Sequence, residues 1–211
     1  MRRTSVTIGG IEFDLKLTLI IILGTIVPML DYYGHKFTSV KAYDRFVWYF
    51  IIPMLVIVLL FRESPVAYGF KIGNWRTGLM WTVAACVGMA IILFFVARTP
   101  SMQQYYNARA PRELWTLVFR NGVELFAWEF VWRGLMFFAF ARAFGPGPAI
   151  FLQAVPFAFM HLGKPEVETL STIFGGAGFG FIAWQSDSFI YPWLIHWFIT
   201  SFTMLIASGR I

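Results

Sequence analysis

Five ionisable side chains interrupt the apolar stretches in the second half of the sequence: Glu124, Glu129, Arg133, His161 and His196. Ionisable groups inside membrane-type apolar segments are costly, so they are functional candidates by default. Glu129 and Arg133 are four residues apart, so on a helix they share one face and can pair. Thr200 follows His196 at the same spacing. We expect the Glu129–Arg133 pair and the two histidines to converge in one polar pocket.

Such a pocket has the groups for hydrolysis of an amide bond. A carboxylate beside a neutral imidazole can take a proton from a water molecule. A second histidine with a hydroxyl one turn later can donate hydrogen bonds to a developing oxyanion. A water nucleophile is favoured over a covalent one, because the sequence has no Gly-x-Ser-x-Gly string and its single cysteine, Cys86, is distant in sequence. The alternative is a structural Glu129–Arg133 ion pair with two core histidines.

The composition indicates where this chemistry would take place. Of the 211 residues, 58% are hydrophobic and only 13% are charged, about half the share usual in soluble domains. This excludes a disordered chain, an ordinary soluble enzyme and a nucleic-acid-binding module. The net charge of +6 is explained by basic loop residues at lipid headgroups. We predict an all-α membrane bundle of about seven or eight transmembrane helices, each about 20 residues long.

The apolar runs give the positions of the helices. We predict spans over residues 17–30, 46–61, 79–97, 150–162 and 189–207. A longer helix is expected to begin at Pro111 and to reach residue 144, as one segment or two. A further helix is expected after Pro165, in which Gly176 and Gly180 permit a close helix–helix contact. Residues 98–112 are polar and contain two prolines, so we predict a loop there.

Three spacings in this half resemble the motifs of the CPBP family of intramembrane proteases, which includes the CAAX prenyl proteases and is also called the ABI family. The family motifs are Glu-Glu-x-x-x-Arg, Phe-x-x-x-His and His-x-x-x-Asn or Asp. Here residues 128–133 read Trp-Glu-Phe-Val-Trp-Arg, residues 157–161 read Phe-Ala-Phe-Met-His, and residues 196–200 read His-Trp-Phe-Ile-Thr. The resemblance implies a single membrane domain, 1–211, with a catalytic core over 113–207 preceded by spans and loops over 1–112.

The resemblance also implies roles for the candidates. Glu129 and His161 would activate water, His196 and Thr200 would stabilise the oxyanion, and Arg133 would hold Glu129. The function expected is a glutamic-type intramembrane endopeptidase that acts on a membrane-embedded, lipidated or C-terminally tagged protein. Its other partners would be membrane lipids, and its location the bacterial cytoplasmic (inner) membrane.

The sequence departs from the family pattern at Trp128, where the family has its general-base glutamate, and at Thr200, where it has Asn or Asp. Two other carboxylates are possible substitutes. Glu124 lies one helical turn before Trp128, and Glu168 follows His161 by seven residues. Residues 161–168 resemble a single-glutamate, myxosortase-like branch that processes sorting tags. The simpler alternative is that Glu168 favours the dipole of a helix N-terminus.

The departure at Trp128 keeps a second function open, namely a non-catalytic scaffold that binds a peptide or a lipid tail. No cofactor is expected, although Glu129, His161 and His196 could in principle bind zinc. The sequence has no His-Glu-x-x-His string, and the resemblance implies a metal-free mechanism. Ligation of haem by the two histidines is a third alternative.

Overall fold

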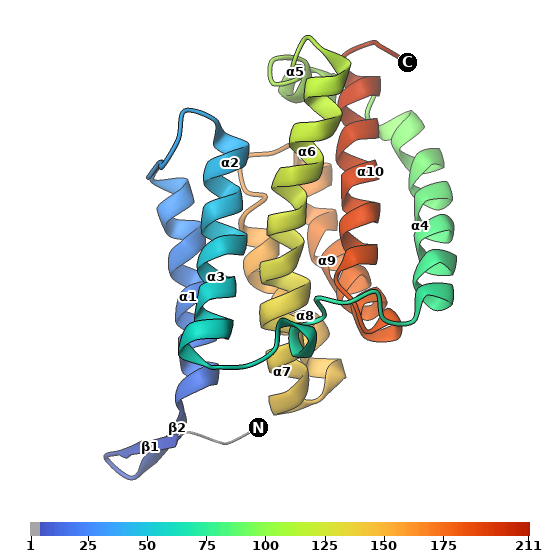
Figure 1. Ribbon diagram of the computed structural model, residues 1–211. Helices are drawn as coiled ribbons and strands as arrows, with labels where there is room; N and C mark the ends of the chain where they lie inside the picture. The colour runs from blue at the N-terminus through green and yellow to red at the C-terminus, as the bar shows by residue number, and fades with distance from the viewer. Residues whose placement is uncertain (1–4) are drawn as a thin grey trace.

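The apolar runs of the sequence fold into a bundle of helices (Figure 1). The computed structural model describes residues 5–211, and residues 1–4 of the predicted N-terminal part lie outside the described residues. The predicted all-α class is confirmed. Helices suit an apolar surrounding because each one satisfies its backbone hydrogen bonds within its own segment.

The N-terminal residues add a small exception to the helical fold. Strands β1 (Ser5–Ile8) and β2 (Ile11–Asp14) pair as an antiparallel hairpin below the bundle (Figure 1). Gly9 and Gly10 form its turn with φ of 60° and 81°, values that glycine adopts without steric cost. Asp14 then caps helix α1 by accepting hydrogen bonds from two backbone amides of its first turn.

The first half of the chain is built mostly from long apolar helices. Its elements are α1 (Leu15–Tyr32), a continuous helix made of α2 (Lys41–Phe46), η1 (Val47–Ile51), α3 (Ile52–Leu55) and η2 (Val56–Leu60), the short turn η3 (Pro65–Tyr68), α4 (Trp75–Val96) and α5 (Pro100–Asn107). The loop predicted over 98–112 is therefore wrong for the residues of α5. Pro100 occupies the first helical position, where its missing N–H has no cost.

The second half contains every candidate residue. Its elements are α6 (Leu114–Glu129), η4 (Phe130–Met136), α7 (Phe137–Phe144), α8 (Pro146–Phe159), α9 (Glu166–Ser186) and α10 (Ile190–Ala207). The first three are contiguous, so the long helix is a single segment that begins at Leu114 rather than at Pro111. Its central part, η4, is a π-helix in which every residue is buried. π-Helical turns are frequent at functional sites.

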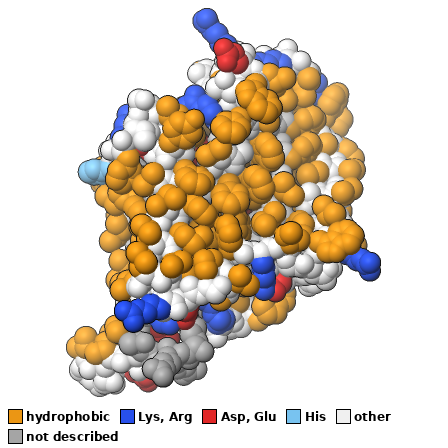
Figure 2. Space-filling model, in the orientation of Figure 1, with side chains coloured by type: hydrophobic (Ala, Val, Ile, Leu, Met, Phe, Trp, Pro, Cys, Tyr) orange, Lys and Arg blue, Asp and Glu red, His pale blue; other side chains and the backbone are white. Residues whose placement is uncertain are grey.

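Four helices of the described chain are long and apolar enough to cross a membrane: α1, the continuous helix over 41–60, α4 and α10. The predicted count of seven or eight spans stays a prediction. Figure 2 shows hydrophobic side chains over the middle of one face, with Lys, Arg, Asp and Glu toward its upper and lower ends. Helix α4 stands at the edge of the bundle beside α10 (Figure 1), and only 6% of its apolar window is buried.

Helices α8 and α9 pack closely, as the glycines predicted. A Cβ atom on Gly176 would lie 3.0 Å from the Phe157 ring, and one on Gly180 would lie 2.7 Å from the Gln153 side chain. Larger residues at either position would push the two helices apart. This contact brings the backbone of α9 against the site.

Candidate active site

An ion pair lies at the centre of the bundle. The Arg133 Nη1 atom donates to Glu129 Oε1 over 2.9 Å, and both side chains are fully buried. The same oxygen lies 2.7 Å from Nδ1 of His196 on α10. The spacing in the sequence predicted the first contact, and the structure adds the second across 67 residues. One carboxylate oxygen therefore receives two donors.

The Arg133 guanidinium is held from several sides. Its carbon lies 3.9 Å from the centre of the Phe157 ring and 4.9 Å from that of Phe179, as in cation–π contacts. Its Nη2 donates to the Gly176 carbonyl oxygen over 3.3 Å, and Gln153 donates to the same oxygen over 2.9 Å. Because α8 and α9 pack closely at Gly176, the Gly176 carbonyl oxygen can accept a hydrogen bond from the buried Arg133 guanidinium.

The two histidines have defined ring orientations. His161 Nδ1 lies 2.9 Å from the Phe157 carbonyl oxygen. A carbonyl only accepts, so Nδ1 carries the proton and Nε2 of the neutral ring has a free lone pair. His196 Nδ1 likewise donates to the Glu129 carboxylate. The two ring centroids are 6.5 Å apart.

Both histidines and Thr200 line one cavity of about 270 Å³ between α4, α5, α9 and α10. Glu168 also lies on its wall, as do Tyr106 from α5 and Thr172 and Phe179 from α9. Side chains of α4 form much of the remaining wall: Met89, Ile92, Leu93 and Val96. Glu129 and Arg133 are not on the wall but lie behind His196. The structure thus joins the five predicted site residues in two layers.

Glu168 is held by two donors. Tyr106 donates from its hydroxyl to Oε2 over 2.6 Å, and Lys164 donates to Oε1 over 2.7 Å. Burial raises the pKa of the Tyr106 hydroxyl well above its ordinary value, and the Glu168 charge adds to this. Tyr106 belongs to the segment that the sequence predicted as a loop. Its only sequence signal is the pair of adjacent tyrosines after Pro100.

Comparison with known proteins gives a match to a family model over part of the chain. Residues 110–202 match the family model described as type II CAAX prenyl endopeptidase Rce1-like. We call this matched part of the chain, residues 110–202, the Rce1-like domain. The resemblance to the CPBP family is thereby confirmed, while the myxosortase-like branch stays a prediction. No curated protein and no solved structure matches the chain. The family consists of intramembrane proteases, and the chain is an integral membrane protein.

Glu124 of the Rce1-like domain lies apart from the cavity. Its carboxylate pairs with Arg45 of α2, which also donates from Nε to Asp31 of α1 over 2.9 Å. The Arg45 guanidinium lies 4.8 Å from the centre of the Trp128 ring. Glu124 therefore joins the first two helices to α6.

Trp128, at the position of the missing glutamate, is buried and packs against His161. The two ring centroids are 5.9 Å apart in an edge-to-face arrangement. The indole Nε1 atom has no hydrogen-bond partner within the described chain. Trp128 thus supplies a wall for the histidine and no proton-transfer group.

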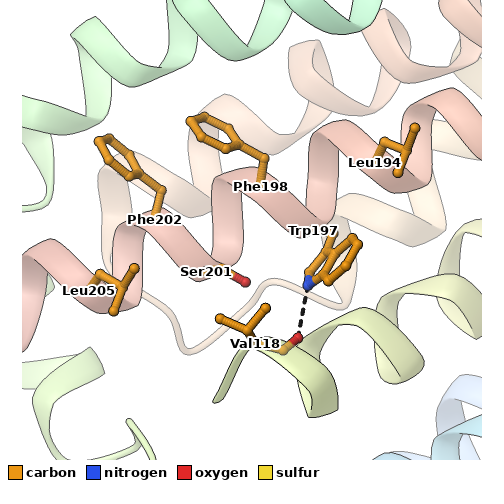
Figure 3. A pocket seen from close by; sticks show the side chains of 7 residues that line it. All are labelled: Val118, Leu194, Trp197, Phe198, Ser201, Phe202 and Leu205. Atoms are coloured by element: carbon orange, nitrogen blue, oxygen red, sulfur yellow. Dashed lines mark hydrogen bonds between the residues drawn. The ribbon is translucent and has the colours of Figure 1, made fainter. Parts of the chain in front are cut away.

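A second hollow of the Rce1-like domain lies between α6 and α10, and Figure 3 shows it from close by. It has a volume of about 300 Å³ and is lined by Val118, Leu194, Trp197, Phe198, Ser201, Phe202 and Leu205. The Trp197 indole donates to the Val118 carbonyl across it over 2.8 Å. Ser201 has the one hydroxyl among these side chains, so this groove lacks the pairs of groups that hydrolysis needs.

The described residues contain no group of three His, Cys, Asp or Glu side chains that could hold a metal ion. Of the three side chains that the sequence suggested as zinc ligands, Glu129 and His196 are in contact. His161 binds the Phe157 carbonyl instead, with its ring 6.5 Å from that of His196.

Proposed function

We propose that this chain is an intramembrane endopeptidase that hydrolyses a peptide bond inside the cavity formed by α4, α5, α9 and α10. The observation that carries the proposal is the meeting of His161, His196 and Thr200 on one cavity wall, with His196 bound to a fully buried ion pair. A cavity between apolar helices excludes bulk water, which strengthens the electrostatic effect of each polar group.

In the proposed reaction, Nε2 of His161 accepts a hydrogen bond from a water molecule and orients it. A carboxylate beside it takes the water proton while the water oxygen bonds to the substrate carbonyl carbon. The carbonyl electron pair moves to the oxygen, which accepts hydrogen bonds from His196 and from the Thr200 hydroxyl. The intermediate then collapses, the carbon–nitrogen bond breaks, and the carboxylic acid returns its proton to the leaving amine.

Glu129 acts in this proposal through His196 and not on water. In the proposed step His196 has a proton on both ring nitrogens, so that Nδ1–H donates to Glu129 and Nε2–H donates to the oxyanion. Arg133 donates to Glu129 and holds its side chain in place within the apolar core. This gives Glu129 and Arg133 positioning roles, one layer behind the groups that would contact substrate.

The proposed substrate is a protein segment that reaches the cavity from the membrane: an embedded, lipidated or C-terminally tagged one. Helix α4 supports this because it forms the apolar side of the cavity and is itself largely exposed. We propose that neither metal nor haem is required, so EDTA is expected to leave the rate unchanged and the purified protein to show no Soret band.

The test uses the purified chain in liposomes with two fluorescence-quenched peptides. One ends in a farnesylated Cys-a-a-X sequence, and the other ends in an apolar helix without a lipid. We expect cleavage of at least one peptide, and a loss of at least about 100-fold in H161A and in H196A. The matched control is H35A, because His35 is the third histidine of the chain and is exposed.

Trp128 supports a second candidate, a membrane scaffold that binds a peptide without cutting it. In that case the wild-type chain binds the two peptides but releases no fragment. Turnover by the purified protein that is lost in H161A and retained in H35A contradicts the scaffold. Wild-type rates in both H161A and H196A contradict the protease mechanism.

A further inference from the structure

We propose that Glu168 is the catalytic carboxylate of this cavity and performs the proton transfer that Trp128 cannot. The inference rests on the proposed peptidase function and names the proton acceptor within it. Among the described residues that line the cavity, Glu168 is the one carboxylate, and it shares the wall with His161, His196 and Thr200.

The position of Glu168 relative to His161 is fixed by the start of α9. The Thr169 hydroxyl donates to the His161 carbonyl over 2.8 Å, and the Lys164 amide donates to the same oxygen over 3.2 Å. Glu168 stands next to Thr169, in the first turn of the helix. The turn that follows His161 therefore places the Glu168 carboxylate on the wall of the cavity that His161 also lines.

Three of the other α9 residues on the cavity wall follow Glu168 at helical spacing, and Val167 and Ser171 complete this part of the wall. Thr172, Gly175 and Phe179 lie four, seven and eleven residues after it, on the same helical face. Glu166 lies two residues before Glu168, about 200° around the helix, and is exposed. The two glutamates in the first turn of α9 therefore lie on different faces of the helix. Glu168 faces the cavity and Glu166 faces away from it.

Glu168 is oriented for proton transfer by donors on both of its oxygens. Tyr106 and Lys164 each use one acceptor position, and a carboxylate has about four, so each oxygen can still accept from water. Its side chain is 20% exposed, whereas that of Glu129 is fully buried with one oxygen bound to two donors. Of the two, Glu168 is the carboxylate that a water molecule in the cavity can contact.

The Glu168 carboxylate accepts a proton from the water held by His161 and becomes a neutral carboxylic acid. The water oxygen bonds to the carbonyl carbon, and the carbonyl oxygen takes the displaced electron pair. When the carbon–nitrogen bond breaks, the Glu168 carboxylic acid gives the proton to the departing nitrogen and is ionised again.

The experiment compares E168Q with E166Q in the liposome assay, using the farnesylated and the apolar-tailed peptides. We expect E168Q to lose about 100- to 10,000-fold in kcat, the range of general acid–base catalysis, and E166Q to keep the wild-type rate. E168A is then assayed with added formate, a small carboxylate that fits the space left by the side chain. Formate is expected to restore part of the E168A rate and to leave E166A unaffected.

Tyr106 offers a graded variant of the same site. Y106F removes one donor from Glu168 and leaves the aromatic packing intact. We expect a fall in kcat of about 10-fold with a smaller change in KM, because the carboxylate is misplaced but present.

The outcomes separate this inference from the proposed function. A wild-type rate in E168Q together with an inactive H196A overturns the role of Glu168 and leaves the peptidase standing. An E168A variant that is folded, inactive and not restored by formate also overturns the base assignment. Absence of turnover by the wild-type chain contradicts both proposals at once.

Discussion

Helix α6 carries two carboxylates that each meet an arginine, and the two ion pairs differ in burial and in what surrounds them. Glu129 and Arg133 are fully buried and contact His196, which opens onto the cavity. Glu124 and Arg45 keep side-chain exposures of 23% and 16% and meet Asp31 of α1. Glu124 and Arg45 line neither the cavity nor the groove between α6 and α10. The first pair orients a group at the cavity, whereas the second joins helices.

Trp128 contacts the arginine of the second pair and a histidine of the cavity. Trp128 packs under the Arg45 guanidinium on one side and against the His161 ring on the other. The position where the family pattern has a glutamate is therefore filled by an apolar spacer. In the mechanism proposed above, proton transfer takes place at Glu168 on the cavity wall and not at this position.

The largest expected effect follows from E129A. Removal of one partner of a buried pair leaves Arg133 unpaired, which costs about 3–5 kcal/mol of folding free energy. His196 also loses its acceptor, so we expect the cleavage rate to fall at least about 100-fold. Thermal unfolding in detergent and the liposome assay measure the two effects.

A double variant separates charge balance from function at the same pair. Replacing a whole buried ion pair with apolar residues of similar size is often neutral or stabilising. E129M/R133M is therefore expected to recover most of the stability lost in E129A while it stays inactive. Recovery of activity in the double variant would show that His196 does not need Glu129.

The next largest effect is expected from substitution of Trp128. W128A removes a large buried side chain and is expected to cost about 3–5 kcal/mol of stability. The cleavage rate should fall roughly tenfold or more, because His161 loses one of its walls. W128F is the control: it keeps an aromatic wall and gives up an N–H that has no partner in the described chain. A W128F variant as inactive as W128A would assign a chemical role to the indole N–H.

The two ion pairs of α6 also show which contacts could be predicted from the sequence. Helical spacing correctly predicted the Glu129–Arg133 contact, since it depends only on neighbouring turns. The apolar runs correctly predicted the four helices that are long and apolar enough to cross a membrane, and the glycines predicted the close contact at Gly176. The sequence could not distinguish Glu124 from Glu168, because their surroundings are set by helices far away in the sequence: Arg45 for the first, Tyr106 for the second. Tyr106 itself was missed, since a short polar helix that covers a cavity has no apolar periodicity.

A smaller effect is expected for the joining pair. E124Q removes one of the two carboxylates at Arg45 and leaves Asp31 in place, so we expect about 1 kcal/mol of destabilisation or less. The cleavage rate should stay within about threefold of wild type, because no group at the cavity moves. E113Q, at the exposed start of the same helix, is the control for a charge change alone. A loss of activity in E124Q as large as in E129A would make the two pairs functionally equivalent.

The smallest expected effect concerns a third charged group, outside the apolar helices. Burial raises the pKa of Glu63, but hydrogen bonds from Lys16 and Tyr68 outweigh it, and the pKa lies below its ordinary value of 4.5. A lowered pKa in the folded state stabilises the protein above about pH 4.5, and this contribution is lost as the pH falls through the lower value. At this partly exposed site it should amount to at most about 1 kcal/mol.

The measurement is the thermal midpoint of wild type and E63Q between pH 3 and 7. The gap between the two proteins should be widest at pH 7 and should close toward pH 3, since glutamine cannot titrate. The cleavage rate of E63Q at pH 7 should equal that of wild type, because Glu63 lines neither the cavity nor the groove. A gap that is constant across this range would mean that the charge of the Glu63 carboxylate does not contribute to the stability of the fold.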